Sequence, residues 1–274
     1  MNRRLLALIG LAAAAAAGYA RFIEPHRLVV ESVPLTLPRL PYAFNHYRIA
    51  HISDLHLGGW MTSKRLLKAV EMVNAERPDL VVITGDFVEK FANEAADELS
   101  VPLKRLRALD GVVAVLGNHD YRYGVPGLRR ILADCGVIEL SNAVHTLRRG
   151  DAQLHIAGLD DQAWHEACLD AVLDQLPRSG AAILLAHEPD YADVTAATGR
   201  FDLQLSGHTH GGQIRLPLIG IPVLPSHGIR YAAGQYQVGR MIQYTNRGLG
   251  MITPYVRFNS RPEITMFTLM AGHA

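Results

Sequence analysis

In the stretch RIAHISDLH, residues 48–56, an apolar run passes directly into Asp54 and His56. Short runs of Val, Ile, Leu and Ala that stop at a polar residue or a glycine are typical of buried strands. The same design occurs four more times along the chain. The five apolar runs are residues 48–53, 80–84, 112–116, 181–186 and 201–206. We therefore predict five buried strands, each followed by a polar loop.

The polar loops carry side chains that bind metals. In open α/β sheets, ligands bind just beyond the carboxyl ends of the strands, so five strand ends can bring such side chains together. The loop motifs are Asp54-Leu55-His56, Gly85-Asp86, Gly117-Asn118-His119-Asp120, His187 and Gly207-His208-Thr209-His210. Asp54 and His56 are two positions apart, as are His208 and His210. In extended backbone this spacing directs both side chains to the same side.

The candidate ligands are nitrogen and oxygen donors without a thiolate: Asp54, His56, Asp86, Asn118, His187, His208 and His210. Such a set suits Mn, Fe or Zn rather than Mg or Ca alone. It exceeds the need of one ion, and a carboxylate such as that of Asp86 has two oxygens with which to bridge two ions. We predict a pair of divalent ions about 3.5–4 Å apart, which lowers the pKa of a bridging water and stabilises an in-line displacement at phosphorus.

The rest of the chain predicts one mixed α/β domain over residues 26–274, with two packed sheets flanked by helices. The chain has 274 residues and shows no linker or internal repeat. Further strands are expected at residues 28–37, 241–245 and 263–269. Helices are expected at residues 63–76, 94–109, 126–135, 163–176 and 189–197. Alternation of strands and helices in the first half predicts parallel pairing there.

Charge and cysteine content argue against a nucleic-acid-binding protein and against a fold held by disulfides. The net charge is +1, so the composition does not indicate a surface that binds polyanions, and no nucleic acid is expected as a partner. Two cysteines, Cys135 and Cys168, do not form a disulfide framework. Both fall in predicted helices, where we expect them to be buried small apolar groups.

Residues 1–25 form a separate N-terminal segment. Arg3 and Arg4 precede an uncharged stretch, residues 5–20, which consists mostly of Leu and Ala. This layout is typical of a signal peptide, and an extension through Phe22 and Ile23 would make it long enough for a membrane anchor. Both alternatives remain open. By the positive-inside rule, the arginine pair stays in the cytoplasm and the following domain lies outside.

The motif set as a whole resembles the calcineurin-like metallophosphoesterase superfamily from about Tyr47 to the C-terminus. The resemblance implies a four-layer αββα sandwich and a dinuclear centre. It implies a first metal held by Asp54, His56, Asp86 and His210. It implies a second metal held by Asp86, Asn118, His187 and His208. His119 is then the general acid or stabilises the charge on the phosphoryl group, and Asp120 orients His119.

Motifs that the chain lacks argue against several branches of the superfamily. Protein phosphatases carry Asp-Arg-Gly where this chain has Asp86-Phe87-Val88, and Glu89 occupies the position of a ligand Tyr in purple acid phosphatases and of a His in nuclease relatives. The run GHTHGGQ, residues 207–213, resembles a bacterial membrane-associated branch. That branch includes phosphodiesterases, which we take as the leading function. It also includes enzymes that hydrolyse UDP-2,3-diacylglucosamine in lipid A synthesis, although this activity belongs to the cytoplasmic face.

The expected substrate is therefore a phosphodiester or a nucleotide-linked lipid. A non-enzymatic metal-bound scaffold is the third alternative, and the complete ligand set argues against it. Residues 121–123, Gln213 and Arg215 are candidates for substrate contacts, although an ordinary loop explains residues 121–123 equally well. His51 lies within a predicted strand, where we expect a core histidine rather than a ligand.

Overall fold

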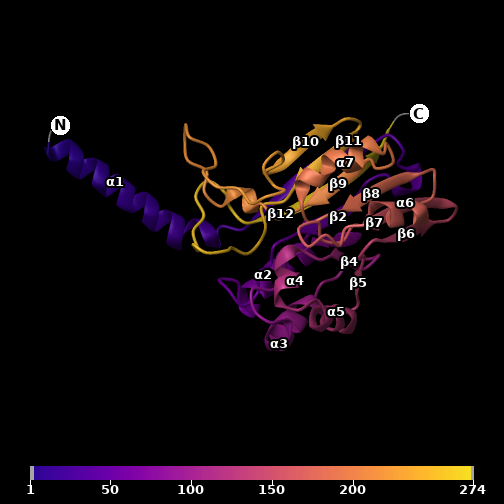
Figure 1. Ribbon diagram of the computed structural model, residues 1–274, viewed down its shortest axis with the longest axis horizontal. Helices are drawn as coiled ribbons and strands as arrows, with labels where there is room; N and C mark the ends of the chain where they lie inside the picture. The colour runs from indigo at the N-terminus through magenta and orange to yellow at the C-terminus, as the bar shows by residue number, and fades with distance from the viewer. Residues whose placement is uncertain (1–2, 273–274) are drawn as a thin grey trace.

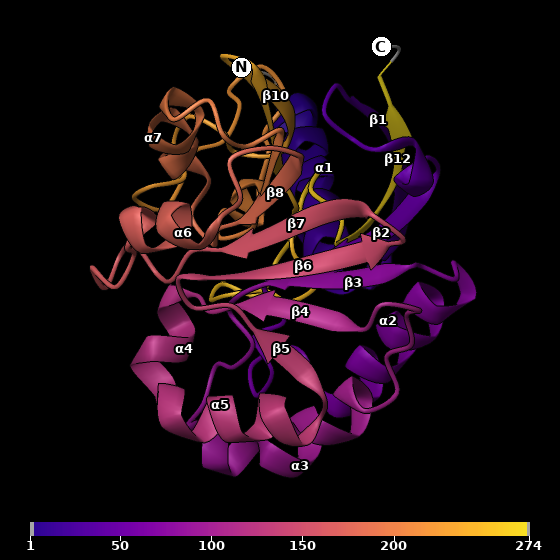
Figure 2. The same cartoon turned by 90° about the vertical axis from the view of Figure 1, so that its right-hand side faces the viewer.

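Two mixed six-stranded sheets pack against each other, and helices cover their outer faces (Figures 1 and 2). The computed structural model describes residues 3–272. The predicted segment 1–25 and domain 26–274 therefore each extend beyond the described chain by two residues. The predicted four-layer αββα arrangement is confirmed.

The first sheet contains the strands that carry the first three metal-binding motifs. Its order is β1, β12, β2, β3, β4, β5. In that order the strands are Val29–Leu37, Glu263–Ala271, Tyr47–Ile52, Leu80–Thr84, Val112–Val115 and Val137–Glu139. Strands β2 to β5 are parallel, as predicted for the first half of the chain, and β12 runs antiparallel to β2. The carboxyl ends of β2, β3 and β4 therefore meet at one edge of the sheet.

The second sheet carries the two remaining motifs and has the order β10, β11, β9, β8, β7, β6. Its strands, in that order, are Gly234–Val238, Met241–Thr245, Leu203–Ser206, Ala181–Leu185, Ala152–Gly158 and Ala143–Arg149. The four inner strands are parallel, and antiparallel strands close both edges. The edge hairpins β6–β7 and β10–β11 contain three strands that the sequence did not predict.

Alternating side chains of β3 face two different cores. Val82 packs between the sheets with residues of the second sheet such as Ile183, whereas Val81 and Ile83 pack under the helices. Burial of each such side chain stabilises the fold by about 1.5–3 kcal/mol. A strand buried on both faces needs an unbroken apolar run, which is why these strands could be predicted from sequence.

The helices α2 (Ser63–Ala75), α3 (Ala92–Leu103) and α5 (Val125–Asp134) cover the first sheet. The helices α6 (Leu169–Gln175) and α7 (Ala192–Ala197) cover the second. Helix α2 begins after Thr62, whose hydroxyl accepts a hydrogen bond from Arg65 N. A short helix, α4 (Asn118–Tyr123), begins at a motif residue and was not predicted.

Two helix predictions are wrong at their ends. Helix α3 starts two residues earlier than predicted and stops at Leu103, because the Asn74 side chain bonds Arg105 O and Arg107 N and holds that segment as a turn. The predicted helix over 163–176 begins only at Leu169. Before it, the Asp161 carboxylate accepts a hydrogen bond from Trp164 N and organises a loop.

The cysteines also differ from expectation. Cys135 is half-buried, but Cys168 lies just before α6 and is exposed rather than buried. Both thiols are free.

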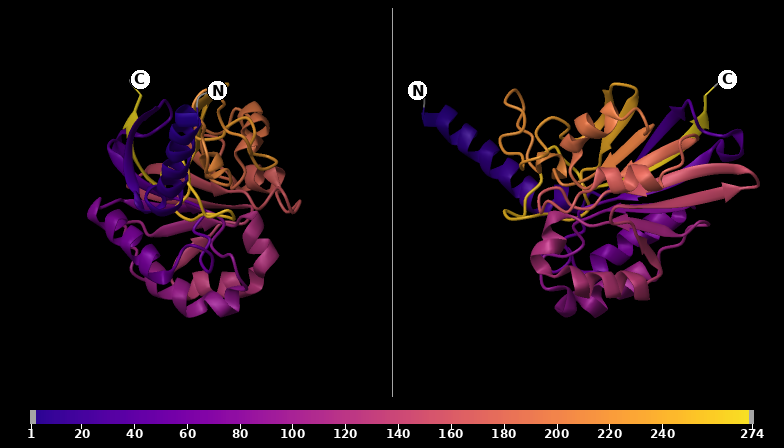
Figure 3. Two further views of the ribbon diagram at one scale, coloured as in Figure 1. Left: turned by 90° about the vertical axis from the view of Figure 1, so that its left-hand side faces the viewer. Right: turned by 45° about the vertical axis from the view of Figure 1, so that its right-hand side comes forward.

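Helix α1 (Arg3–Phe22) projects away from the two sheets (Figures 1 and 3). Ala20 is its buried residue, and Leu8 and Leu11 are among several large apolar side chains that it exposes. The helix is long and apolar enough to cross a membrane. Its 20 residues span about 30 Å, the thickness of a bilayer's hydrocarbon core.

Candidate metal centre

The loops after β2, β3, β4, β8 and β9 converge at the carboxyl ends of the two sheets. They bring together three groups of potential metal-binding atoms, each within 4.8 Å: Asp54, His56 and His210; Asp86, His187 and His208; and His56, Asp86 and His119. The predicted histidine and aspartate ligands therefore meet in one place. All of them are buried, and His119 is half-buried.

Left-handed backbone, rather than strand alternation, aims most of these side chains. Positive φ angles occur at Asp54 (50°), His56 (47°), Asp86 (55°), His208 (71°) and His210 (52°). The expectation that extended backbone directs the paired residues to one side is therefore wrong, because the chain has already left the strand. Such conformations cost about 1–3 kcal/mol each and cluster at functional sites, where the surrounding structure holds them.

Two glycines let the loops approach closely. A Cβ atom on Gly117 would collide with Asp86 Oδ1, and one on Gly207 would collide with the side chains of Ser53 and Asp54. Any larger residue at either position would push a predicted ligand out of place.

Asp86 lies between the two groups of ligands. Its Oδ2 is 3.4 Å from His56 Nε2 and 3.3 Å from His187 Nε2. Its Oδ1 accepts a hydrogen bond of 2.9 Å from His119 N. Burial opposes ionisation of Asp86, but the charge and hydrogen bond of His187 outweigh it and hold the pKa well below its usual range. One carboxylate oxygen is thus placed to serve both halves of the centre.

His187 and His208 face each other through the ring nitrogens that point into the centre. His187 Nδ1 donates to Thr84 O at 2.7 Å, and His208 Nε2 donates to Ser226 O at 2.8 Å, because a carbonyl oxygen only accepts. The opposite nitrogens, His187 Nε2 and His208 Nδ1, lie 3.2 Å apart. Burial lowers the pKa of His187, but Asp86, whose Oδ2 lies 3.3 Å from His187 Nε2, outweighs it and raises that pKa. A divalent ion would take the place of a proton between these groups, since imidazole binds metal in its neutral form.

The other half of the centre shows the same pattern. His56 Nδ1 lies 2.7 Å from Glu89 Oε2, which turns Nε2 into the centre, where it faces His210 Nε2 at 3.0 Å. Asp54 Oδ1 is 3.6 Å from His210 Nε2. The Asp54 carboxylate also accepts a hydrogen bond from His208 N and so joins the two halves.

Asn118 offers a further donor atom. Its Oδ1 is buried and has no hydrogen-bond partner among the described residues. Such an orphaned oxygen is costly unless an ion or water satisfies it. Together, the oxygen and nitrogen donors fit divalent ions of the Mn, Fe or Zn kind.

Glu89, rather than Asp120, lies beside His119. Glu89 Oε2 is 2.8 Å from His119 Nδ1 as well as 2.7 Å from His56 Nδ1. Burial alone would raise the pKa of Glu89, but hydrogen bonds to His119 and His56 lower it to about 2. Burial lowers the pKa of His119, but Glu89 and Asp86 outweigh it and raise that pKa. From the sequence, Glu89 distinguished this chain from purple acid phosphatases and nuclease relatives, but its contact with the two histidines was not predicted.

Asp120 has other partners. Its Oδ1 accepts a hydrogen bond from Phe87 N at 2.7 Å, and its Oδ2 accepts one from Gly117 N at 2.9 Å. Burial and the nearby Asp86 raise the pKa of Asp120 to about 7. The side chain therefore ties the loop after β3 to the loop after β4 instead of contacting His119.

The other residues singled out from the sequence have mixed outcomes. His51 is fully buried in the core beside Thr84 Oγ1, as expected. The side chains of Gln213 and Arg215 form hydrogen bonds with backbone groups. Gln213 Oε1 accepts from Ile252 N, and Arg215 Nε donates to Gly211 O. Tyr121 stacks on Trp164, and Trp164 Nε1 donates to Asn118 O. Trp164 thus flanks the centre, without a sequence motif to reveal it.

Comparisons with known proteins agree with this site. A family model described as calcineurin-like phosphoesterase matches residues 47–212. The chain is 36% identical over 267 residues to the metallophosphoesterase YkuE of Bacillus subtilis (strain 168), covering 96% of this chain and 93% of that protein. It is 32% identical over 229 residues to the phosphodiesterase YaeI of Escherichia coli (strain K12), covering 82% of each.

A transmembrane protein with a metallophosphoesterase domain from Danio rerio is 32% identical over 282 residues, which cover 98% of this chain and 63% of that protein. Among solved structures, TT1561 of Thermus thermophilus superposes with a TM-score of 0.51 at 13% identity, covering 75% of this chain and 91% of the other. The sulfate thiohydrolase SoxB of the same organism gives 0.50 at 15% identity, covering 84% and 57%. At such low identity these two structures support the fold alone.

Proposed function

The chain belongs to the calcineurin-like phosphoesterase family, and we propose that it is a dinuclear-metal phosphodiesterase. Asp54, His56, Asp86 and His210 would hold one ion. Asp86, Asn118, His187 and His208 would hold the other. The observation that carries this proposal is the pair of inward-facing nitrogens of His187 and His208, 3.2 Å apart beside the carboxylate of Asp86.

Two divalent ions, when bound, neutralise phosphoryl oxygens and lower the pKa of water. The protein contributes the geometry and the proton for the leaving group. His119 is our candidate for that proton: Glu89 holds its Nδ1 side, which leaves Nε2 to face the substrate. Glu89 and Asp86 outweigh burial and raise the pKa of His119, which favours the protonated imidazole that a general acid requires.

The name of the relative YaeI supports diesters over monoesters as substrates. The test is hydrolysis of bis(p-nitrophenyl) phosphate beside p-nitrophenyl phosphate by chelator-stripped protein, with Mn, Zn, Fe or Mg restored singly. Faster cleavage of the diester with a restored ion is expected. Faster cleavage of the monoester would refute the diester preference, and no turnover of either ester despite two bound ions would favour a narrow substrate or a scaffold.

We further propose that α1 is retained as a membrane anchor of the bacterial membrane-associated branch and that the catalytic domain is extracytoplasmic. The exposed apolar side chains of α1, its length and the transmembrane relative support the anchor, and the arginine pair at its start supports the side. Alkaline carbonate extraction of membranes containing the full chain should leave the protein in the pellet. Release into the supernatant would refute anchoring.

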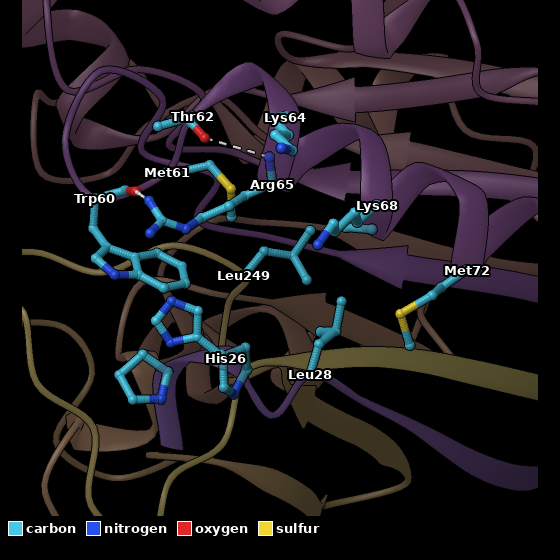
Figure 4. A pocket seen from close by; sticks show the side chains of 13 residues that line it. His26, Leu28, Trp60, Met61, Thr62, Lys64, Arg65, Lys68, Met72 and Leu249 are labelled. Carbon is cyan, nitrogen blue, oxygen red and sulfur yellow. Dashed lines mark hydrogen bonds between the residues drawn. The ribbon is translucent and has the colours of Figure 1, made fainter. Parts of the chain in front are cut away.

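A lipid substrate is the second candidate, and a cavity of about 580 Å³ beside the end of α1 favours it (Figure 4). Leu28, Trp60, Met72 and Leu249 give it apolar walls, and Lys64 and Lys68 lie at its side. None of the seven predicted ligands lines this cavity, so an acyl chain there would be held apart from the metals. Hydrolysis of UDP-2,3-diacylglucosamine by the metal-loaded protein would establish this candidate, and failure to cleave it would exclude that substrate.

A further inference from the structure

A long loop between η4 (His210–Gly212) and β10 exposes an apolar tip. Residues 216–225, here called the apolar loop, read LPLIGIPVLP and contain no charged residue. The side chains of Leu218, Ile219 and Val223 are 108%, 74% and 75% exposed. The orange loop in Figures 1 and 3 projects from the same side of the molecule as α1. Within residues 3–272, no other loop gathers as many fully exposed aliphatic side chains.

The tip of the apolar loop is a tight turn with Leu218 at its apex. Leu216 N donates to Gly220 O at 2.8 Å, and Gly220 N donates to Leu216 O at 2.9 Å. Two features of Leu218 are unfavourable in water. Leu218 has a φ of 67°, a conformation that favours glycine or asparagine. Its side chain also gains nothing from burial. An apolar environment outside the protein would offset both costs.

The stem of the apolar loop is fixed to the metal centre. Ser226 O accepts the hydrogen bond from His208 Nε2 at 2.8 Å. His227 O accepts from Asp190 N at 3.0 Å, and the Asp190 carboxylate accepts from Ile229 N at 2.8 Å. The tip therefore has a set position relative to His208. Whatever surface binds the tip also sets the orientation of the metal centre toward that surface.

We infer that the apolar loop inserts into the lipid surface that α1 crosses, so that the metal centre receives phosphoesters of membrane lipids from that surface. This inference rests on the anchoring proposed above and adds a substrate class to the proposed hydrolysis. A bilayer is the occupant because the loop offers aliphatic side chains without charges to specify a protein partner, and because α1 marks the same side.

Tryptophan fluorescence tests the insertion with the full chain. The protein has two tryptophans, Trp60 and Trp164, which are first replaced by Phe. Single tryptophans are then placed by Leu218→Trp at the tip, Leu11→Trp in α1 and Leu109→Trp as a matched control. Leu109 is 76% exposed and lies in the turn before β4, at the end of the sheet opposite the metal loops. The proteins are reconstituted in phosphatidylcholine and phosphatidylglycerol vesicles with or without dibrominated acyl chains.

Brominated lipid should quench the tryptophan at position 218 by at least half and leave the one at position 109 nearly unchanged. Equal, weak quenching at 218 and 109, with strong quenching at position 11, would overturn the insertion while leaving the anchor intact. Weak quenching at position 11 would refute the anchor and, with it, the inference that the loop enters the surface that α1 crosses. If Leu218→Trp lowers metal content, Ile219→Trp serves as the second probe at the same tip.

A second variant separates lipid contact from folding. Leu218→Asn suits the left-handed backbone better than leucine does, so its Tm should equal or exceed that of the parent protein. With this variant, hydrolysis of bis(p-nitrophenyl) phosphate in solution should stay within about twofold, whereas a tryptophan at Ile219 should lose at least half of its quenching by brominated lipid. Unchanged quenching would show that the tip does not depend on leucine for insertion and would contradict the inference.

Discussion

The two sheets contribute different chemistry to the metal centre. Loops of the first sheet carry the candidate carboxylate ligands Asp54 and Asp86 and the candidate amide ligand Asn118, whereas the candidate ligands on loops of the second sheet are imidazoles alone. The first sheet's His56 is oriented by a carboxylate, that of Glu89. The second sheet's His187 is oriented by a backbone carbonyl. Among the candidate ligands, negative charge thus comes from the first sheet, and the second sheet offers imidazole nitrogens.

Hydrogen bonds across the two sheets make the halves depend on each other. His187 Nδ1 donates to Thr84 O at the end of β3, and His208 N donates to the Asp54 carboxylate after β2. The interior apolar layer between the sheets sets these distances. Metal binding and sheet packing are therefore coupled, because neither sheet alone holds a complete site.

The largest effect is expected from removal of the carboxylate that serves both halves. Asp86→Asn should lower metal affinity and turnover by more than about 100-fold, the upper range for loss of a partner outside the ligand set. Metal analysis after dialysis and the rate on bis(p-nitrophenyl) phosphate measure both. Asp97→Asn on the exposed face of α3 is the matched control. Full metal occupancy and a normal rate for Asp86→Asn would show that the two halves of the centre do not depend on this carboxylate.

His119 should matter for the reaction and not for the ions. His119→Ala should retain both metals but lose about 10²–10⁴ in kcat on a diester with a poor leaving group, as for loss of a general acid. Nitrophenolate leaves without protonation, so the loss on nitrophenyl esters should be smaller. An equal loss for good and poor leaving groups would contradict the acid role.

Glu89→Gln should have an intermediate effect, because Glu89 orients His56 and His119 from the first sheet's side. Loss of such a partner costs about 10–100-fold in metal affinity or activity. Glu89 contributes to the raised pKa of His119, so its removal should let His119 lose its proton at lower pH. The alkaline limb of the kcat profile should therefore move to lower pH. An alkaline limb at the same pH as in the parent protein would contradict the contribution of Glu89 to the pKa of His119. Glu94→Gln, on the exposed face of α3, serves as the control.

Asp120 should show the smallest effect on rate. Asp120→Ala removes the acceptor for Phe87 N and Gly117 N and leaves buried donors unsatisfied, at about 1–3 kcal/mol each. Urea unfolding should register this loss of stability. With saturating metal, kcat should fall less than for His119→Ala. A loss as large as that of His119→Ala would restore Asp120 to the role predicted from the sequence.

Much of the fold and of the convergence at the centre could be predicted from sequence, because strands buried on both faces need uninterrupted apolar runs and the candidate ligands follow them directly. The edge strands β6 and β10 lack such runs, since they are half-exposed. The loop at 163–168 was mistaken for a helix because the carboxylate of Asp161, outside the apolar pattern, bonds Trp164 N.

The outer contacts of the centre could not be predicted in the same way. Glu89 lies three residues after Asp86, but only the fold turns it toward His56 and His119. Ser226 contributes a backbone carbonyl, which any residue has, so no sequence signal marks its contact with His208. The left-handed conformations at the predicted ligands are equally invisible, because Asp and His do not indicate a positive φ as strongly as glycine does.

Anomalous X-ray diffraction from crystals grown with Mn²⁺ would show whether Asp86 joins two metal sites. Two peaks about 3.5–4 Å apart are expected, with Asp86 in contact with both. Asp54, His56 and His210 should surround one, and Asn118, His187 and His208 the other. A single peak, or two peaks of which only one contacts Asp86, would contradict the claim that one carboxylate of the first sheet joins the two halves.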